Sequence, residues 1–194
     1  PTPHPTFPAA NPMAGGAGGV AATGDPHLQN VHGERFDLMK PGLHVLINIP
    51  RGALAENALL RVQADARRLG GSCADLFFQA LNVTGSWAEA KQDGGYQYVV
   101  SHRAVEAPEW LAFGGVELKV VHGHTQNGLE YLNFFVRRLR RAGFAVGGLL
   151  GEDDHKDATT PPASCIHRTS LLEPPSEAHD HGLSVSAVAV ASLE

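Results

Sequence analysis

Apolar and polar residues alternate with a period of two in several short segments of this chain, and that period decides the type of secondary structure. Residues 60–67 place an apolar side chain at every second position, and residues 116–120 do the same. Successive side chains of a strand point to opposite faces, so both segments are predicted as half-buried strands. The alanines, leucines and arginines of residues 53–69 also suit a helix, but eight residues of alternation favour the strand.

Further strand-like segments are more continuously apolar, and pairs of glycines punctuate the chain between them. These segments are residues 43–49, 76–83, 96–100 and 132–136. Glycine pairs mark turns because glycine adopts backbone conformations that other residues avoid. Many short strands with glycine-rich turns predict an all-β fold, either an antiparallel β-sandwich or a flattened barrel, with irregular N- and C-terminal tails.

The composition predicts one β domain between two tails. Fifteen of residues 1–23 are Pro, Gly or Ala, a composition that cannot form a core. We therefore expect a linker or partner-docking tail over residues 1–23, the β domain over 24–168, and an extended loop with a terminal strand over 169–194. The small, alternating residues of 183–194 suit addition to an exposed sheet edge, so both tails are expected to dock on other protein subunits.

Charge and motifs exclude several functions. The net charge of −5 argues against nucleic acid as a partner. No apolar run reaches the roughly 20 residues that span a bilayer, so no transmembrane segment is expected. The chain begins at Pro1 without a signal-peptide pattern, which predicts a removed targeting segment or a fragment. Nucleophile, phosphate-loop and dinucleotide motifs are absent from the sequence, so we expect no enzyme apart from self-processing.

Two motifs about 120 residues apart carry a family resemblance. Residues 24–27 read Gly-Asp-Pro-His, and residues 148–151 read Gly-Leu-Leu-Gly before an acidic run. In this order and spacing they resemble the von Willebrand factor type D domain, over about residues 24–168. The chain also resembles the C-terminal domain of the inter-alpha-trypsin inhibitor heavy chains. The resemblance implies a sandwich in a secreted, surface or lumenal protein, and so an extracytoplasmic location.

The Asp25–Pro26 bond has chemistry of its own. An Asp carboxyl group can attack its own carbonyl carbon, proline nitrogen is a good leaving group, and His27 is close enough in sequence to carry the proton. In some members of the family this bond cleaves itself at mildly acidic pH. The alternative is a tight turn in which Pro26 fixes the backbone and Asp25 caps the next turn.

The resemblance also implies a calcium site, and calcium is the only cofactor that it suggests. The acidic run offers Glu152, Asp154 and Asp157 as oxygen ligands. His32 stands where the family supplies an Asp, which weakens calcium and favours a borderline metal. The alternative is a solvated acidic turn.

Three further features bear on location and partners. Cys73 and Cys165 are the only cysteines, and we predict that they form a disulfide as expected in an oxidising compartment. Asn82 begins a glycosylation sequon. The cations Arg137, Arg138, Arg140 and Arg141 suit an anionic glycan, or else a solvated strand end.

The function favoured by these features is a non-catalytic structural or interaction module of a secreted, surface or lumenal protein assembly. Two alternatives stay open: a self-processing domain that cleaves at Asp25–Pro26, and a domain that binds a metal or an anionic glycan.

Overall fold

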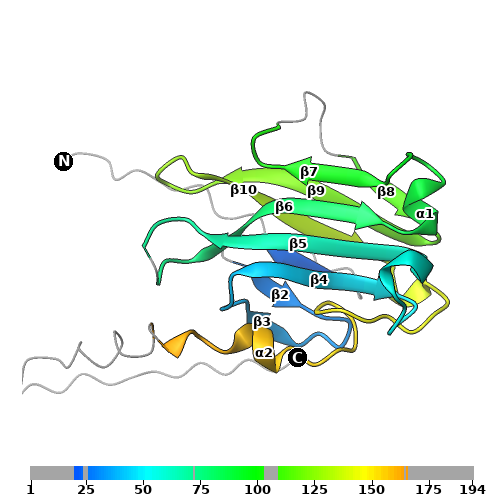
Figure 1. Cartoon of the computed structure of the whole chain (residues 1–194), viewed down its shortest axis with the longest axis horizontal. Coiled ribbons are helices and arrows are strands. Elements are labelled where there is room, and N and C mark those ends of the chain that lie inside the picture. The colour runs from blue at the N-terminus through cyan, green and yellow to red at the C-terminus, as the bar shows by residue number, and fades with distance from the viewer. Residues whose placement is uncertain (1–19, 24–25, 72, 103–108, 164, 166–194) are drawn as a thin grey trace, which may run out of the picture.

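The computed structural model describes residues 20–23, 26–71, 73–102, 109–163 and 165, and these form a mostly β fold (Figure 1). The helical elements are short: η1 (Ala55–Asn57), α1 (Ser86–Glu89), η2 (Leu139–Arg141) and α2 (Lys156–Thr159). The strands are β1 (Val20–Thr23), β2 (His27–Gln29), β3 (Arg35–Asp37), β4 (Gly42–Ile49), β5 (Leu60–Arg68), β6 (Leu76–Thr84), β7 (Tyr96–Val99), β8 (Leu111–Phe113), β9 (Val116–His124) and β10 (Glu130–Arg137).

All described strand pairs are antiparallel, and they form one continuous sheet that folds into two layers. The main path runs β3-β2-β1-β10-β6-β5-β4, with β7 beside β6 and β9 between β10 and β8. The first layer holds β4 to β7, and the second holds β8, β9, β10 and β1 to β3. They are joined where Leu132 of β10 pairs with Phe78 of β6. In Figure 1 the first layer lies in front of the second.

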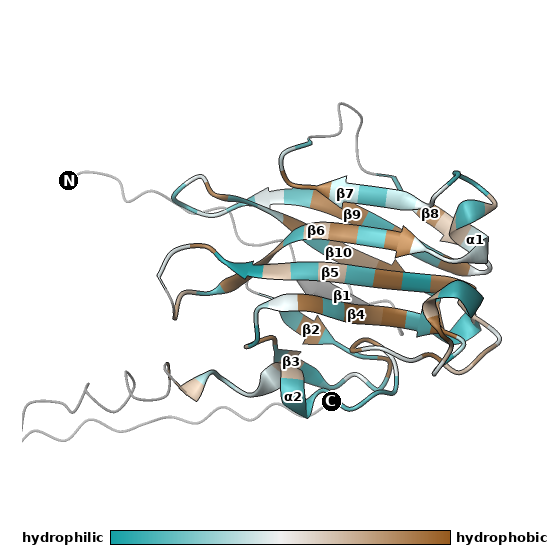
Figure 2. Ribbon diagram, viewed as in Figure 1, coloured by the Kyte–Doolittle hydropathy of each residue, from teal (hydrophilic) through white to brown (hydrophobic). Residues whose placement is uncertain are grey.

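The core lies between the two layers and follows from the alternation in the sequence. On β5 the buried side chains are Leu60, Val62, Ala64 and Ala66, and the residues between them point outward. Figure 2 shows this alternation as bands of brown and teal along the strands. Phe113 and Phe134 are among the largest fully buried side chains, both at the face where the second layer meets the first. The apolar face of each strand therefore fixes which side of the sheet turns inward.

The antiparallel, mostly β part of the prediction is confirmed, and the flattened-barrel alternative is wrong. The described strands do not close into a barrel, because the path ends at β3 and at β4. The helical alternative for residues 53–69 is also wrong apart from one short turn, η1. From Leu60 onward that segment is β5, whose buried face packs in the core.

The sheet begins earlier than the domain boundary that the sequence suggested. Val20–Thr23 lies in the stretch assigned to the tail, yet it forms β1 between β10 and β2. The alanines and the neighbouring glycines of this stretch hide the strand, because they supply too little hydrophobic contrast for an alternating pattern. The rest of the two predicted tails, residues 1–19 and 169–194, lies outside the described residues.

A disulfide joins Cys73 and Cys165, as predicted, with 5.5 Å between their Cα atoms. It ties the chain after α2 to the turn between β5 and β6. Such a bond is consistent with an extracytoplasmic protein. Among the described residues, no helix is long and apolar enough to cross a membrane.

Candidate functional site

The second motif of the family resemblance contacts the loop that follows the first motif. The Gly-Leu-Leu-Gly turn (residues 148–151) is wedged between β4 and the loop after β2. On one side, the N–H groups of Leu149 and Leu150 donate to the carbonyls of Val45 and Leu46 at 3.0 and 2.9 Å. On the other side, the Val31 N–H donates to the Leu150 carbonyl at 2.9 Å. The turn therefore bridges the two layers at the open ends of the sheet.

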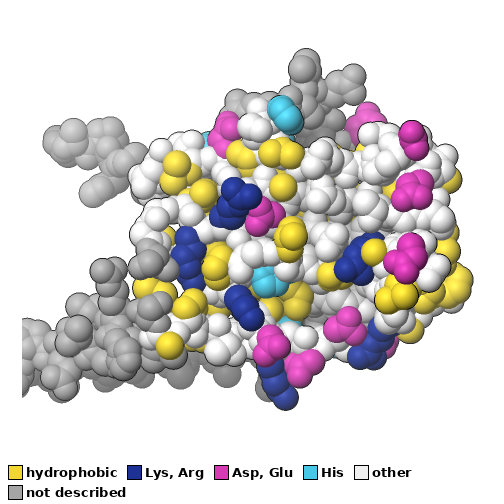
Figure 3. Space-filling view, viewed as in Figure 1, with side chains coloured by type: hydrophobic (Ala, Val, Ile, Leu, Met, Phe, Trp, Pro, Cys, Tyr) yellow, Lys and Arg dark blue, Asp and Glu magenta, His cyan; other side chains and the backbone are white. Residues whose placement is uncertain are grey.

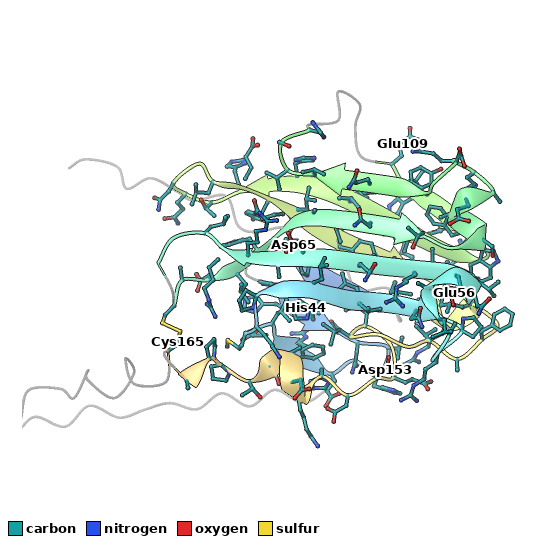
Figure 4. All side chains as sticks on the ribbon, in the orientation of Figure 1. His44, Glu56, Asp65, Glu109, Asp153 and Cys165 are labelled. Atoms are coloured by element: carbon teal, nitrogen blue, oxygen red, sulfur yellow. A yellow bond between two sulfur atoms is a disulfide. The ribbon has the colours of Figure 1, made fainter. Side chains whose placement is uncertain are left out.

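The acidic loop (residues 152–157) is held by one aspartate that the sequence did not single out. Asp153 accepts a hydrogen bond from the backbone N–H of Gly148 at 2.5 Å and one from Arg51 Nε at 2.7 Å. Glu152 lies 3.4 Å from the same guanidinium. In Figure 4 Asp153 lies beneath β4, toward the end of the molecule opposite Cys165. This carboxylate thus closes the Gly-Leu-Leu-Gly turn and pairs with Arg51.

The predicted metal ligands are not gathered into a cluster. Asp154 accepts a hydrogen bond at 2.9 Å from the N–H of Lys156, the first residue of α2. Asp157 and His32 are exposed. Over the described part of the chain, no group of three or more His, Cys, Asp or Glu side chains is arranged to hold a metal ion. The geometry therefore gives the predicted calcium site no support.

His27 is held by an aspartate ten residues further along the chain. Its Nδ1–H donates to Asp37 Oδ1 at 2.5 Å, across the antiparallel pair of β2 and β3. Pro26 is buried, and its carbonyl accepts the N–H of Leu38 at 3.2 Å. Asp25, the other half of the predicted cleavage bond, lies outside the described residues.

The arginine run does not form a single patch. Arg138 pairs with Glu117 at 2.8 Å, and Arg140 donates to the carbonyl of Val31. Arg137 instead stacks on the ring of Trp110, with 3.8 Å from its Cζ to the ring centroid. Arg141 is exposed beside them. The cations therefore diverge, because β10 ends at Arg137 and the chain turns at Arg138, whose φ is 59°.

Asn82, the first residue of the sequon, lies in β6 between Gln63 of β5 and Gln97 of β7. Its side chain is half-buried on the outer face of the first layer.

In the part of the chain that the structure describes, two side chains have pKa values shifted mainly by loss of water. Burial lowers the pKa of His44, with the nearby charge of Lys40 acting in the same direction. A hydrogen bond from Nε2 to the Lys40 carbonyl at 2.7 Å and the charge of Asp65 oppose that shift. Burial likewise raises the pKa of Tyr98, with a smaller contribution from Tyr96.

We expect His44 to make the protein less stable in acid. Because its pKa is lower in the folded chain, the unfolded chain binds more protons as the pH falls below about 6.5, and the folded state loses stability. Urea unfolding of wild type and His44→Gln at pH 7.5 and at pH 5 measures this. The variant should lose less stability than wild type over that interval. An identical loss in both proteins contradicts the prediction.

A comparison with protein-family models finds no match to this chain, and a comparison with curated proteins finds none either. The resemblance therefore rests on the residues themselves and on their arrangement.

Sequence reasoning missed Asp153, its partner Arg51, and Asp37. The first two lie 102 positions apart, and no local pattern joins them. Asp37 lies in a segment that the sequence did not predict as a strand. The strand there, Arg35–Asp37, has only three residues, too few to show an alternating pattern.

Proposed function

We propose that this chain is a non-catalytic structural or interaction module of a secreted, surface or lumenal protein assembly, built as a von Willebrand type D-like β-sandwich. The observation that carries the proposal is the hydrogen bond of 2.9 Å from Val31 to Leu150. It joins the segment after Gly-Asp-Pro-His to the Gly-Leu-Leu-Gly turn, which supports the order of the two motifs that the resemblance rests on. The disulfide agrees with an extracytoplasmic location.

Exposed apolar side chains support a role in binding other protein subunits. Leu54 and Phe144 are 64% and 52% exposed. They lie on neighbouring loops, which are joined by the hydrogen bond of 2.8 Å from Arg51 to the Ala145 carbonyl. The ring of Phe144 also lies 6.3 Å from that of Trp87. Large apolar side chains grouped at a surface lose contact with water when a partner covers them. The rest of the two predicted tails, residues 1–19 and 183–194, supplies the other proposed docking segments.

Sedimentation of the full chain in its native extracellular or lumenal fluid tests the assembly role. We expect the wild-type chain to travel in a complex with a fixed ratio of subunits. Leu54→Ser with Phe144→Ser should shift it toward the monomer. Leu43→Ser is the matched control, because Leu43 is 69% exposed but stands on β4 opposite Asp65. A wild-type chain that sediments alone would overturn the proposal.

Self-processing at Asp25–Pro26 is the second candidate function, and the pair of His27 with Asp37 favours it. The Asp25 carboxylate would form a C–O bond to its own carbonyl carbon, giving a cyclic anhydride. The C–N bond would break as the Pro26 nitrogen takes a proton from His27, and water would then open the anhydride. Asp37 would hold the imidazolium in place, as a carboxylate does for a catalytic histidine.

We expect the wild-type chain to cleave slowly at pH 5 and to stay intact at pH 8. Asp25→Asn should abolish cleavage, and His27→Ala and Asp37→Asn should slow it on the order of a hundredfold, the typical contribution of a proton donor. A denaturing gel and N-terminal sequencing of the product measure this, with Pro26 as the expected first residue. Intact wild-type protein after days at pH 5 rules the second candidate out.

A further inference from the structure

The outer face of the second layer holds two cations against one tryptophan. Trp110 immediately precedes β8, Lys119 is in β9, and Arg137 ends β10. The Cζ atom of Arg137 lies 3.8 Å from the centroid of the Trp110 ring, and Lys119 Nζ lies 5.9 Å from it. Three neighbouring strands therefore bring these side chains together from positions that are far apart in the sequence.

Among the residues that the structure describes, neither Lys119 nor Arg137 forms an ion pair with a carboxylate. Glu117 lies opposite Arg137 in the strand register, but its carboxylate pairs with Arg138 at 2.8 Å. The three cations, Lys119, Arg137 and Arg138, and the one anion, Glu117, thus carry a net charge of +2. By contrast, Figure 3 shows positive and negative side chains interspersed on the face of the first layer. Two like charges held close together are stabilised when an anion binds between them.

Stacking also prepares Arg137 to bind an oxyanion. A guanidinium that lies on an aromatic ring keeps its N–H donors in the plane of the group, where they can reach both oxygens of a sulfate or carboxylate. Arg137 is exposed, while Trp110 and Lys119 are half-buried, so the cluster is fixed at its base and open at its edge. Little side-chain entropy remains to be lost on binding.

We propose that Trp110, Lys119 and Arg137 form a binding site for a sulfated polysaccharide. The repeating oxyanions of such a chain match separate cations, and its sugar rings suit the neighbouring apolar surface of Phe135, which pairs with Lys119 across the strands. The disulfide is consistent with a compartment where sulfated glycans occur. This site is independent of the assembly proposed above, since the two proposals have different surfaces and readouts.

Retention of the full chain on immobilised heparin tests the site. Lys119→Gln with Arg137→Gln should weaken binding on the order of tenfold and lower the slope of log affinity against log salt by about two. Arg67→Gln with Lys156→Gln is the matched control. It removes the same charge from side chains that are 68% and 88% exposed, on β5 and α2. The control should bind almost as well as wild type.

Two further variants separate a built site from diffuse charge. Trp110→Leu should weaken heparin binding without any change of charge, and Arg137→Lys should weaken it because the planar donors are lost. Thermal melting of each variant confirms that it folds. Equal loss of binding in the two double variants would overturn the proposal. So would a single-stranded oligonucleotide that competes with heparin as well as heparin itself, because the site would then select charge alone.

Discussion

Loss of the disulfide is expected to have one of the largest effects on this protein, lowering the free energy of unfolding by about 4–5 kcal/mol. Cys73 and Cys165 are separated by 92 positions, so the bond closes a long loop and removes much of the freedom of the unfolded chain. That loop contains β6 to β10 and the Gly-Leu-Leu-Gly turn. The bond therefore restricts the unfolded chain over most of the domain, and not only at the chain end.

Urea unfolding of wild type and of Cys73→Ser with Cys165→Ser measures the effect. The variant should keep its β-sheet circular dichroism but unfold at a much lower midpoint. Reduced wild type, which lacks the bond but keeps both cysteines, controls for the serines and should match the double variant. A double variant within about 1 kcal/mol of wild type would show that the unfolded chain gains little freedom when the bond is absent.

Local patterns predicted the elements whose side chains meet water on one face and the core on the other. β5 is the clearest case, since its alternation appears in the sequence and in the burial of Leu60 to Ala66. β6 and β10 were also expected within one to two residues of their bounds. A strand of this kind has its period fixed by geometry, so the sequence shows it directly.

Elements that depend on distant partners could not be predicted in the same way. β1 has little pattern of its own, and it is a strand because β10 and β2 supply hydrogen bonds on both sides. The fold into two layers likewise depends on the single pairing of Leu132 with Phe78. The local alternation of apolar and polar residues shows neither the order of the strands nor the place where the sheet passes from one layer to the other.

The candidate sites show the same limit. The acidic loop was predicted to supply metal ligands because the family resemblance implies a calcium site there and its carboxylates suit calcium. Its central carboxylate, Asp153, instead binds Arg51 and the backbone of Gly148. The arginine run looked like one patch, but β10 ends within it and sends its side chains to different partners. Residue type suggested the chemistry, and only the fold decided which groups meet.

Replacement of Gly148 by alanine is expected to destabilise the domain strongly. Gly148 has a φ of +87°, which costs an alanine about 1 kcal/mol or more. A Cβ atom there would lie 2.6 Å from the carbonyl oxygen of Leu46 and 2.9 Å from the nitrogen of Ile47, both in the backbone of β4. Backbone atoms of a buried strand cannot move aside easily, so overpacking should add about 1–3 kcal/mol. The hydrogen bond of Gly148 to Asp153 would also be disturbed.

Gly143→Ala separates these contributions, because Gly143 has a φ of +77° but nothing within 4 Å of the added Cβ. The control should lose only the cost of the backbone conformation, while Gly148→Ala should lose that plus the cost of the clash, roughly 2–4 kcal/mol in total. Chemical unfolding of both variants gives the difference directly. If the two are equally destabilised, the Gly-Leu-Leu-Gly turn does not press against β4 in solution, and its contacts with β4 and with the loop after β2 would lose their role in positioning the layers. A larger loss for Gly148 would show that its small size, and not only its flexibility, lets the turn join the two ends of the sheet.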